Sequence, residues 1–383
     1  MLVGGYIRDA LLDIDSKDID IELYNIKSFS QLENILEEFG DVNSVGKSFG
    51  VCKLRYEDLD LDFSLPRSDS KHSKGHRGFE ISIDSSLDFK SASSRRDFTI
   101  NAMGYDVKSK KILDPFNGLI DLNNSLIRAV DLKKFGEDPL RILRAIQFAS
   151  RFNFKIDEEL FLECKIMVKN SLLEELAKER IFTEIQKLLL KSMQPSLGLK
   201  LAQKLNIVNY IGDYSRLDTL DYFALHKSNN SDNDMLTFLS LLYSSKHIYQ
   251  IYTITDKVKL IEQIKKNIAS KKSFPLDSFN DYELYKLAME VNIDNFSLYL
   301  NASYLGERYK EILKMKVRAK ELGISTKKAL PLIQGRDILN LGIAPSKEYK
   351  SILNKAYEAQ IKGVFSSTNE AKIWLKESLR NRL

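Results

Sequence analysis

The segment MLVGGYIRDALLDIDSKDIDIE, residues 1–22, carries the strongest structural signal in the chain. Its last six residues alternate charged and apolar side chains, and a period of two is typical of a β-strand. This period places Asp18, Asp20 and Glu22 on one face of the strand and two isoleucines on the other face, against a core. Because Mg²⁺ in proteins favours a few carboxylates completed by waters and substrate phosphates, Asp18 and Asp20 are candidate metal ligands.

Two glycines, Gly4 and Gly5, stand before this strand, and the residues that follow them predict a short helix over Tyr6–Leu12. Glycine permits a tight turn, and a helix N-terminus presents free N–H groups, so this turn leaves room for a phosphate. Each signal alone has an ordinary alternative, since an acidic solvent-facing strand also contains D-x-D and any tight turn can contain two glycines. Their close succession is more specific, and it suggests metal-assisted nucleotidyl transfer.

The composition is that of an ordinary folded protein. The 383 residues are enough for roughly two to four modules, and 43% of them are hydrophobic, which permits folded cores throughout. No apolar run is long enough to span a bilayer, and Arg8 and Asp9 interrupt any signal-peptide core near the start. Two cysteines, Cys52 and Cys164, are too few for a disulfide framework or a cysteine-based zinc site, so we expect a reduced, cytoplasmic location. The net charge of +5 permits a polyanionic partner.

A second acidic strand is predicted further along. Residues 49–55 and 59–64 predict a β-hairpin, in which Asp60 and Asp62 share one face. If the second of these strands lies beside the first acidic strand, Asp62 becomes a candidate third carboxylate at the metal site. A solvated edge strand is the alternative for both residues.

The next segment, PRSDSKHSKGHRG over residues 66–78, is polar, basic and punctuated by glycine, so it predicts a mobile loop. A strand is expected again over residues 79–83. His72 and His76 lie four residues apart in this loop. Because the segment has no helix signal, we do not expect the two histidines to bind a metal.

The motif RRDFTINAM, residues 95–103, combines charge with an apolar plug. Arginine suits triphosphate oxygens in charge and geometry, and an aspartate can accept a hydrogen bond from a ribose hydroxyl. Arg96 and Asp97 are therefore candidate nucleotide-binding residues. A buried turn held by a structural Arg–Asp pair is the alternative, and it is the simpler interpretation of this motif taken alone.

From Glu137 onward the periodicity of the sequence is helical. Asp138 and Pro139 predict a helix start, with Asp138 as the N-cap and Pro139 in the first helical position. Arg141 and Arg144 lie three residues apart on one flank of this helix, and Gln147 continues their row. Basic clusters recur along the later helices; each alone fits a solvated face, and together they fit a phosphate backbone. The sequence therefore predicts an α/β head followed by a long all-helical region.

Five motifs occur in the order LVGGYIRDALL with KDIDIE, RRDFTINAMGYD, DPFNGLIDLNNSLIR, GEDPLRILRAIQFASRF and ELAKERIFTEIQKLL. Together they resemble the class II tRNA nucleotidyltransferase (CCA-adding enzyme) and bacterial poly(A) polymerase family, within the DNA polymerase beta superfamily. The resemblance covers roughly residues 2–190, and LIQGRDILNLGIAPSKEYKSILNKAYEAQIKGVF is more loosely similar to the C-terminal end of bacterial members. It implies a polymerase-beta-like mixed sheet with helices, followed by an all-α neck, body and tail. The expected bounds are 1–130 for the nucleotidyltransferase head, 131–200 for the base-recognising neck, 201–322 for the body and 323–383 for the tRNA-binding tail.

The resemblance also implies residue roles. Asp18 and Asp20 would hold two Mg²⁺ ions, one activating the tRNA 3′-hydroxyl and the other neutralising the triphosphate and the leaving pyrophosphate. The nucleotide would be bound by two groups of residues. Its phosphates and ribose would contact Gly5, Arg8, Arg96 and Asp97, and its base would contact Asp138, Arg141 and Arg144 of the E-D-x-x-R stretch.

The base-reading role has a physical rationale of its own. Cytosine and adenine each present an exocyclic amine beside an acceptor ring nitrogen, so a carboxylate accepts from the amine and a guanidinium donates to the ring nitrogen. Uracil and guanine present a carbonyl oxygen and a protonated ring nitrogen instead. Unpaired polar groups in a closed site are costly, so rejection should be strong without any template. A helix cap at Asp138, worth about 1 kcal/mol, is compatible with this role.

Two features depart from the family pattern. Met1 stands directly at the first motif, where relatives usually carry a few more strand residues. Gln147 occupies a position at which many members carry an arginine, which puts phosphate contact there in doubt. No His-Asp dyad of an appended phosphohydrolase domain is visible, and we expect His226 and His247 to be surface or packing residues.

We therefore expect template-independent addition or repair of the 3′-terminal CCA of tRNA from CTP and ATP, with Mg²⁺ as cofactor. The helical region should hold the acceptor arm by shape and backbone charge. Alternatives within the class are addition of the terminal A alone, which implies a separate CC-adding enzyme, of CC alone, or of a poly(A) tail. The loop at 66–78 argues against CC-only addition, because the resemblance links such a loop to the switch to ATP, and no long basic extension of a poly(A) polymerase is visible. A non-catalytic RNA-binding module is the alternative from another class, and the preserved acidic residues argue against it.

Overall fold

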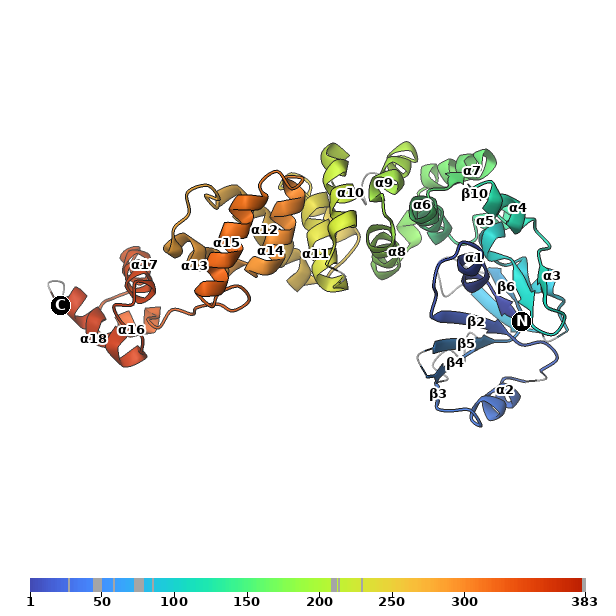
Figure 1. Cartoon of the computed structure of the whole chain (residues 1–383), viewed down its shortest axis with the longest axis horizontal. Coiled ribbons are helices and arrows are strands. Elements are labelled where there is room, and N and C mark those ends of the chain that lie inside the picture. Colours follow the sequence, from blue (N-terminus) through green and yellow to red (C-terminus); the bar gives the residue numbers. More distant parts are fainter. Residues whose placement is uncertain are drawn as a thin grey trace. The chain divides into compact units, whose positions relative to one another are not determined.

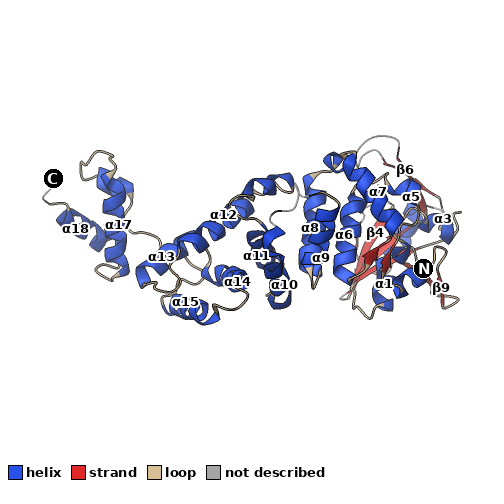
Figure 2. Cartoon of the chain, turned by 90° about the horizontal axis from the view of Figure 1, so that it is seen from above, coloured by secondary structure: helices blue, strands red, loops and turns tan. Residues whose placement is uncertain are grey.

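The computed structural model describes residues 1–26, 28–43, 50–57, 59–71, 79–84, 86–207, 212, 214–228 and 230–380. The chain forms two compact units. The first comprises Met1–Ile211 and Tyr252–Thr255, and the second comprises Gly212–Ile251 and Asp256–Leu383. All described strands belong to the first unit, and the described part of the second is helical (Figure 1, Figure 2). The α/β head and the helical remainder expected from the sequence are confirmed, while the finer four-part division stays a prediction.

A seven-stranded mixed sheet forms the centre of the head. Its strands are β1 Leu2–Val3, β2 Asp18–Glu22, β3 Val42–Asn43, β4 Val51–Tyr56, β5 Leu59–Ser64, β8 Gly104–Asp106 and β9 Lys111–Leu113. Their order is β3-β4-β5-β2-β1-β8-β9, and β2 and β5 are parallel whereas the other neighbours are antiparallel. The register sets Asp18 opposite Asp60 and Asp20 opposite Asp62. The two acidic strands are therefore adjacent, as the sequence analysis required for a shared site.

Short helices accompany this sheet. Helix α1, Gly5–Leu11, follows the glycine turn, and α2, Phe29–Leu36, begins after Ser28, whose hydroxyl accepts a hydrogen bond from the Gln31 N–H. The apolar side of α2 lies against the sheet in a buried cluster of Leu32, Leu36, Cys52, Leu54 and Leu65. The other helices of the head are α3 Phe89–Ser93, η3 Thr99–Asn101 and α4 Gly118–Asn123.

One predicted loop is partly a strand. Residues Arg67–Lys71 form β6, which pairs antiparallel along its whole length with β7, Phe79–Ile83. The prediction of a loop over 66–78 is wrong for this strand, because pairing with β7 satisfies the backbone N–H and C=O groups of a polar segment as well as those of an apolar one. His72 and His76 lie with the rest of that loop outside the described residues.

Helices follow the head within the first unit. Helix α6, Leu140–Phe152, is buried along most of its length and packs against α8, Lys178–Lys191, and α9, Pro195–Lys204. Gly198 permits this close packing, since a Cβ there would lie 2.5 Å from Cδ1 of Leu188. The other elements of this region are β10 Leu126–Ile127, α5 Leu132–Phe135, β11 Lys155–Ile156, α7 Glu158–Lys169 and η4 Leu172–Glu175.

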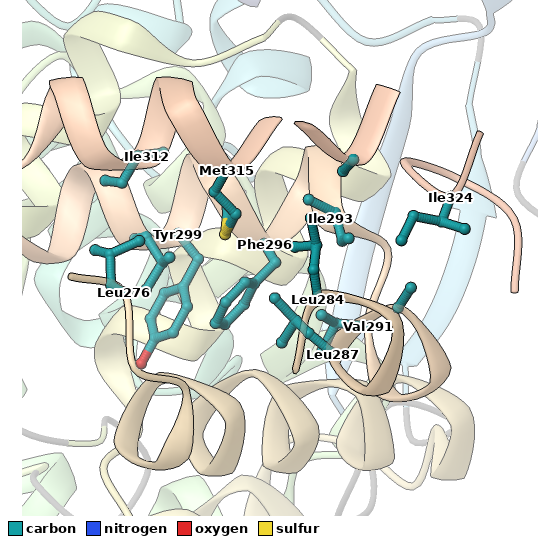
Figure 3. Close-up of a cluster of buried hydrophobic side chains, with 13 residues drawn as sticks. Leu276, Leu284, Leu287, Val291, Ile293, Phe296, Tyr299, Ile312, Met315 and Ile324 are labelled. Carbon is teal, nitrogen blue, oxygen red and sulfur yellow. The ribbon is translucent and has the colours of Figure 1, made fainter. Parts of the chain in front are cut away.

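The described part of the second unit is helical, and buried apolar side chains pack between its helices. Its elements, with one short helix shared with the first unit, are η6 Tyr214–Arg216, α10 Leu217–His226, α11 Ser231–Leu242, η7 Ile248–Thr253, α12 Val258–Ser273, α13 Asp281–Glu290, α14 Ile293–Ser303, α15 Tyr309–Glu321, α16 Gly335–Leu339, α17 Glu348–Ile361 and α18 Thr368–Ser378. One core packs around Phe296, Tyr299 and Met315 (Figure 3). Another includes Ile338 and Leu375 of α16 and α18. None of the described helices combines the length and the apolar character that crossing a bilayer needs.

Candidate active site

The acidic face of β2 is open to solvent over its first part. Asp18 and Asp20 are exposed, whereas Glu22 at the end of the strand is 1% exposed. Glu22 accepts a hydrogen bond from Tyr24 Oη at 2.5 Å and forms an ion pair with Arg95 Nη2 at 3.2 Å. Since Glu22 is committed to the interior, Asp18 and Asp20 are the two carboxylates of β2 that remain exposed to solvent.

Asp62 lies beside Asp20 on the neighbouring strand β5, as the prediction of a third carboxylate required. Its carboxylate forms an ion pair with Lys53 of β4, at 2.7 and 2.9 Å from Nζ. Among the described residues, no group of three or more His, Cys, Asp or Glu side chains is arranged to hold a metal ion. The site thus offers Asp18 and Asp20, with Asp62 adjacent but paired, and a metal role for Asp62 stays a prediction.

Two carboxylates fit the way in which proteins hold Mg²⁺, which keeps one or two of them and completes its shell with waters and substrate phosphates. The electrostatics of Asp20 agree with this use. Asp20 keeps access to solvent, yet the protein atoms around it partly desolvate its carboxylate and raise its pKa. The negative charges of Asp62 and Asp18 raise this pKa further, whereas the positive charges of Arg96 and Lys53 lower it. A divalent cation at this face would relieve the crowding of like charges.

Arg96 is held against the glycine turn beside Asp20. Gly4 has φ +72°, and a Cβ at Gly4 would lie 2.6 Å from Arg96 Nη1 and 3.3 Å from Asp20 Oδ2. Glycine leaves space for the guanidinium and adopts this backbone without strain; Gly5 then begins α1. Arg96 Nε is buried and has no hydrogen-bond partner within the part of the chain that the structure describes. A guanidinium with an unused donor beside two carboxylates is suited to a phosphate group.

Arg8 lies differently from what the resemblance implied. Its guanidinium donates to Asp9 Oδ1 from Nε and Nη2, at 2.8 and 2.5 Å, and to Asn101 Oδ1 from Nη1, at 2.5 Å. Its Cζ also lies 4.9 and 4.7 Å from the ring centroids of Phe148 and Phe152. Arg8 is 3% exposed, so it links the first motif to α6 within the interior. This arrangement gives no support to a phosphate contact by Arg8, which stays a prediction.

Asp97 and Arg144 form an ion pair, with Arg144 Nε 2.6 Å from Asp97 Oδ2. Asp97 Oδ1 accepts further hydrogen bonds from Asn101 Nδ2 at 3.0 Å and from the Phe98 N–H at 2.9 Å. Burial is the largest single effect and opposes the charge of Asp97, but Arg144, Asn101 and Arg141 together outweigh it and hold the pKa of Asp97 below its ordinary value. This is the structural Arg–Asp pair that the sequence left open as an alternative, although its arginine comes from α6. A ribose contact by Asp97 stays a prediction.

The remaining candidates surround the start of α6. The helix begins at Leu140, one residue later than predicted, and Asp138 Oδ1 accepts a hydrogen bond from the Leu140 N–H at 3.1 Å. Asp138 Oδ2 accepts from Nη2 of Arg180, a residue of α8, at 2.9 Å. Arg141 donates to two backbone carbonyl oxygens at 3.0 and 2.9 Å. These hydrogen bonds hold Asp138 and Arg141 in place. The carboxylate of Asp138 keeps further lone pairs for a ligand, and the guanidinium of Arg141 keeps further N–H groups.

Sequence reasoning missed the residues that join the motifs to one another. Asp9 accepts a hydrogen bond from Arg151 Nη2 at 3.2 Å, and Glu184 of α8 lies 4.0 Å from Arg144 Nη1. Asn101 connects the first and second motifs through its amide. All of these residues, and the Arg180 described above, lie inside the five quoted motifs. Their location inside these motifs was the signal that could have found them, but it does not indicate which partner each residue contacts.

Three further residues from the sequence analysis have defined surroundings. Gln147 is 2% exposed, and its Nε2 has no partner among the described residues, so a phosphate contact there finds no support. His226 stacks on Tyr222 with ring centroids 4.2 Å apart, and its Nδ1 lies 2.7 Å from the carbonyl oxygen of that residue. His247 Nδ1 lies 2.7 Å from Ser244 Oγ. Both histidines have the packing or surface positions that the sequence predicted.

Two family models match the chain. Residues 1–128 match the Poly A polymerase head domain, and residues 153–212 match the probable RNA and SrmB-binding site of polymerase A. The CCA-adding enzyme of Francisella tularensis is 30% identical over 303 residues, which cover 76% of this chain and 80% of that protein. The chain belongs to the class II CCA-adding enzyme family.

Other members of the CCA-adding enzyme family match shorter parts. The CCA-adding enzyme of Buchnera aphidicola is 32% identical over 264 residues, and the multifunctional CCA protein of Neisseria gonorrhoeae is 37% identical over 186 residues. These matches cover 68% and 49% of this chain. The chain spans 60% of the length of the first relative and 43% of that of the second.

Solved structures of CCA-adding enzymes share the fold. The Bacillus stearothermophilus CCA-adding enzyme in complex with CTP has a TM-score of 0.71 at 20% identity, over 100% of this chain and 93% of the other. A CCA-adding enzyme in complex with ATP has a TM-score of 0.67 at 23% identity, over 100% and 91%. The mixed sheet and the helical remainder are therefore those of CCA-adding enzymes.

Proposed function

We propose that this chain adds or repairs the 3′-terminal CCA of tRNA from CTP and ATP, without a nucleic-acid template. The observation that carries the proposal is the parallel register of β2 and β5, which leaves Asp18 and Asp20 on an open face with Arg96 beside them. Carboxylates for a metal ion and a guanidinium for phosphates are what nucleotidyl transfer from a triphosphate requires. Relatives named CCA-adding enzymes, and solved structures of such enzymes with CTP and with ATP, support the choice of tRNA and of the two nucleotides.

Asp18 and Asp20 are the proposed ligands of Mg²⁺. When bound, two such ions would activate the tRNA 3′-hydroxyl and neutralise the triphosphate and the leaving pyrophosphate. The chain's own part is positional: β2 fixes the two carboxylates on one face, and the turn at Gly4 holds Arg96 next to Asp20. At this position the guanidinium of Arg96 is the proposed phosphate-binding group. Asp62 is a proposed third contributor because of its place beside Asp20.

The base is proposed to be read by Asp138, Arg141 and Arg144. A carboxylate that accepts from an exocyclic amine and a guanidinium that donates to a ring nitrogen select cytosine and adenine together. Asp97 orients Arg144 through the 2.6 Å ion pair, and Arg180 orients Asp138. Because these partners are protein groups, the pattern of donors and acceptors is preformed, and a mismatched base leaves buried polar groups unpaired.

Two other products use the same site. Addition of the terminal A alone would imply a separate CC-adding enzyme in the same cytoplasm. Poly(A) synthesis is favoured by one observation, the match of residues 1–128 to the Poly A polymerase head domain. Both alternatives keep the same catalytic residues, so they are separated by the product and not by the geometry.

The test is an extension assay with purified protein, Mg²⁺ and three tRNA transcripts, which end at the discriminator base, at C and at CC. Each transcript receives CTP, ATP or both, and the products are resolved at single-nucleotide resolution. We expect the bare transcript to grow to full CCA with both nucleotides. A single A on the CC-ended transcript alone would identify an A-adding enzyme, a ladder of adenylates would identify a poly(A) polymerase, and no product from any transcript would overturn the proposal.

A further inference from the structure

A polar cavity lies within the second unit, apart from the residues of the candidate active site. Its volume is about 300 Å³, room for a small polyatomic ion with several waters at about 30 Å³ each. The lining includes residues of five elements: Arg216 of η6, Thr219 of α10, Ser240 of α11, Lys271 of α12 and Ser303 of α14. Chain segments far apart in sequence therefore converge on one polar site.

Three cationic residues line this cavity, Arg216, Lys271 and Lys272. Among the described residues, no carboxylate forms an ion pair with Lys271 or Arg216, and none lines the cavity. Lys271 Nζ lies instead 5.6 and 5.1 Å from the ring centroids of Tyr299 and Tyr304. Arg216 Nη2 donates to the Ser303 carbonyl oxygen at 2.5 Å, which leaves other N–H groups of its fork unused. Cations gathered in this way favour an anion between them.

The charge of Lys271 is unfavourable in the empty cavity. Burial, together with the smaller effect of the nearby Arg216, lowers the pKa of Lys271 to about 8. A buried cation normally has a paired or hydrogen-bonded partner, because its desolvation is otherwise uncompensated. The protein supplies ring faces and a second cation here, so the missing partner is negatively charged.

A buried hydroxyl completes the site. Ser303 is 1% exposed and is one of the residues that line the cavity, and its buried Oγ interacts with the Tyr299 phenol without a hydrogen bond of adequate geometry to any described group. The other buried hydroxyls are already used as donors: Ser240 Oγ donates to a carbonyl oxygen at 2.7 Å, and Thr219 Oγ1 does the same at 2.7 Å. Unlike these two hydroxyls, the Ser303 hydroxyl has no carbonyl acceptor among the described residues, so it can turn toward a ligand oxygen. Tyr299 itself lies at one side of the core in Figure 3.

We propose that this cavity binds one phosphate group, with Lys271 and Arg216 supplying the positive charge and Ser303 a hydrogen bond. A phosphate presents several charged oxygens to different donors at once, which matches an ammonium, a guanidinium fork and a hydroxyl placed around a single space. The phosphate comes either from the backbone of an RNA or from a free anion. The RNA source rests on the proposed function, whereas the site itself does not.

The first arm of the test uses inorganic phosphate and the full chain. Thermal unfolding is followed with increasing sodium phosphate against sodium chloride at equal ionic strength, for the wild type, Lys271→Met and Arg216→Gln. We expect phosphate to raise the Tm of the wild type by several degrees more than chloride does, and the two variants to lose most of that difference. Lys271→Met keeps the aliphatic stem and removes an unfavourable charge, so it should fold. Lys310→Met, which removes an exposed lysine of α15 outside the cavity, is the matched control and should respond as the wild type.

The second arm measures equilibrium binding of a tRNA transcript at several salt concentrations, without nucleotides. If the phosphate belongs to RNA, Lys271→Met should weaken binding severalfold and lower the slope of log affinity against log salt by about 1, as expected for one lost phosphate contact. If the source is a free anion, the phosphate effect on Tm is lost while tRNA binding stays that of the wild type. The proposal is overturned if Lys271→Met and Arg216→Gln keep both the phosphate-dependent Tm and the tRNA affinity of Lys310→Met. Neither arm involves nucleotide transfer, so its result is independent of whether the proposed function holds.

Discussion

Gly4 is the residue through which the backbone controls the position of Arg96. An alanine there would have to adopt φ +72° and would place its methyl group 2.6 Å from Arg96 Nη1, so the guanidinium must move away from Asp20. We expect Gly4→Ala to lower the free energy of unfolding by about 1–2 kcal/mol. Because a displacement of about 1 Å in a catalytic group costs about 10²-fold in rate, nucleotide addition should fall by about that factor.

Gly323→Ala separates the two effects. Gly323 has φ +68°, yet a Cβ there would meet no heavy atom within 4 Å. Gly323→Ala should therefore lose similar stability in urea unfolding and keep the wild-type rate of nucleotide addition. If both variants add nucleotides at the same rate, Gly4 does not act through Arg96.

Arg141 tests the base-reading site. Its guanidinium is held by two backbone carbonyl oxygens at the start of α6, and a hydrogen bond from a charged group contributes about 1.5–3 kcal/mol. Arg141→Ala should relax the preference for CTP and ATP over UTP and GTP by about 10- to 100-fold. The measurement is competition among the four nucleotides, with Lys169→Ala on α7 as the control. An unchanged preference would remove Arg141 from the site.

The carboxylates of the site could be predicted from the sequence, and the surroundings of Arg8 could not. A period of two is a local signal, and it correctly placed Asp18 and Asp20 on one open face. The motif around Arg8 was equally visible, but the partner that accepts from its Nη1, Asn101, lies 93 positions away. Phe148, which covers the same guanidinium, is further still along the chain. Burial set by residues so distant in sequence has no local pattern.

Helix α4 is fixed against η3 through a second glycine. A Cβ at Gly118 would lie 2.2 Å from the Thr99 carbonyl oxygen, and this backbone cannot move without shifting the segment that carries Arg96 and Asp97. Gly118→Ala should destabilise the protein by about 2–3 kcal/mol, the range of overpacking in a close-packed interior. Urea unfolding measures this, with Gly335→Ala as the control because its Cβ would meet Tyr349 at an ordinary 3.9 Å. Equal unfolding midpoints for the two variants would contradict the contact.

Helix α12 carries a lysine that makes stability depend on pH. The pKa of Lys271 falls from 10.5 to about 8 in the folded protein, first through burial and then through Arg216. Between these two values the unfolded chain binds more protons than the folded protein, so the free energy of unfolding should rise as pH increases from about 8 to about 10.5. Lys271→Met lacks this group. Its stability relative to the wild type should fall across the same window, and a constant difference in urea unfolding would contradict the shift.

The elements whose ends are set by residues nearby in the sequence were predicted best. The start of α6 was predicted to within one residue, since the Asp138 cap and the adjacent proline act within one turn. Strand β6 was missed because its polar residues are ordered by pairing with β7, which comes later in the chain. The sequence could not predict that β2 and β5 are neighbours, because no local signal fixes which strands pair. The third carboxylate of the site was therefore predicted only on the condition that the two strands lie side by side.

On the scale of the whole molecule, the quoted motifs of the active site belong to the first unit. The second unit was predicted as helical, with a tRNA-binding tail and with basic clusters that fit either solvated faces or a phosphate backbone, but its cavity was not predicted. Arg216, Lys271 and Ser303 each have ordinary sequence surroundings, and separate elements bring them together. Cys52 and Cys164 are both buried, and neither forms a disulfide.

One measurement tests the proposed catalytic role of the β2 carboxylates most directly. The rate of transfer of a single nucleotide from CTP to a tRNA transcript is measured in single turnover for the wild type, Asp18→Asn and Asp20→Asn. Asp60→Asn is the matched control, because Asp60 is an exposed carboxylate on the neighbouring strand opposite Asp18. Thermal unfolding of each variant shows that the fold is kept.

We predict that Asp18→Asn and Asp20→Asn each lose about 10³-fold or more in rate, because a metal ion stabilises the transition state by several kcal/mol and each factor of ten corresponds to about 1.4 kcal/mol. Asp60→Asn should transfer at the wild-type rate, and all three variants should unfold near the wild-type temperature. A folded Asp18→Asn or Asp20→Asn that transfers CMP as fast as Asp60→Asn would contradict the assignment of these carboxylates to catalysis.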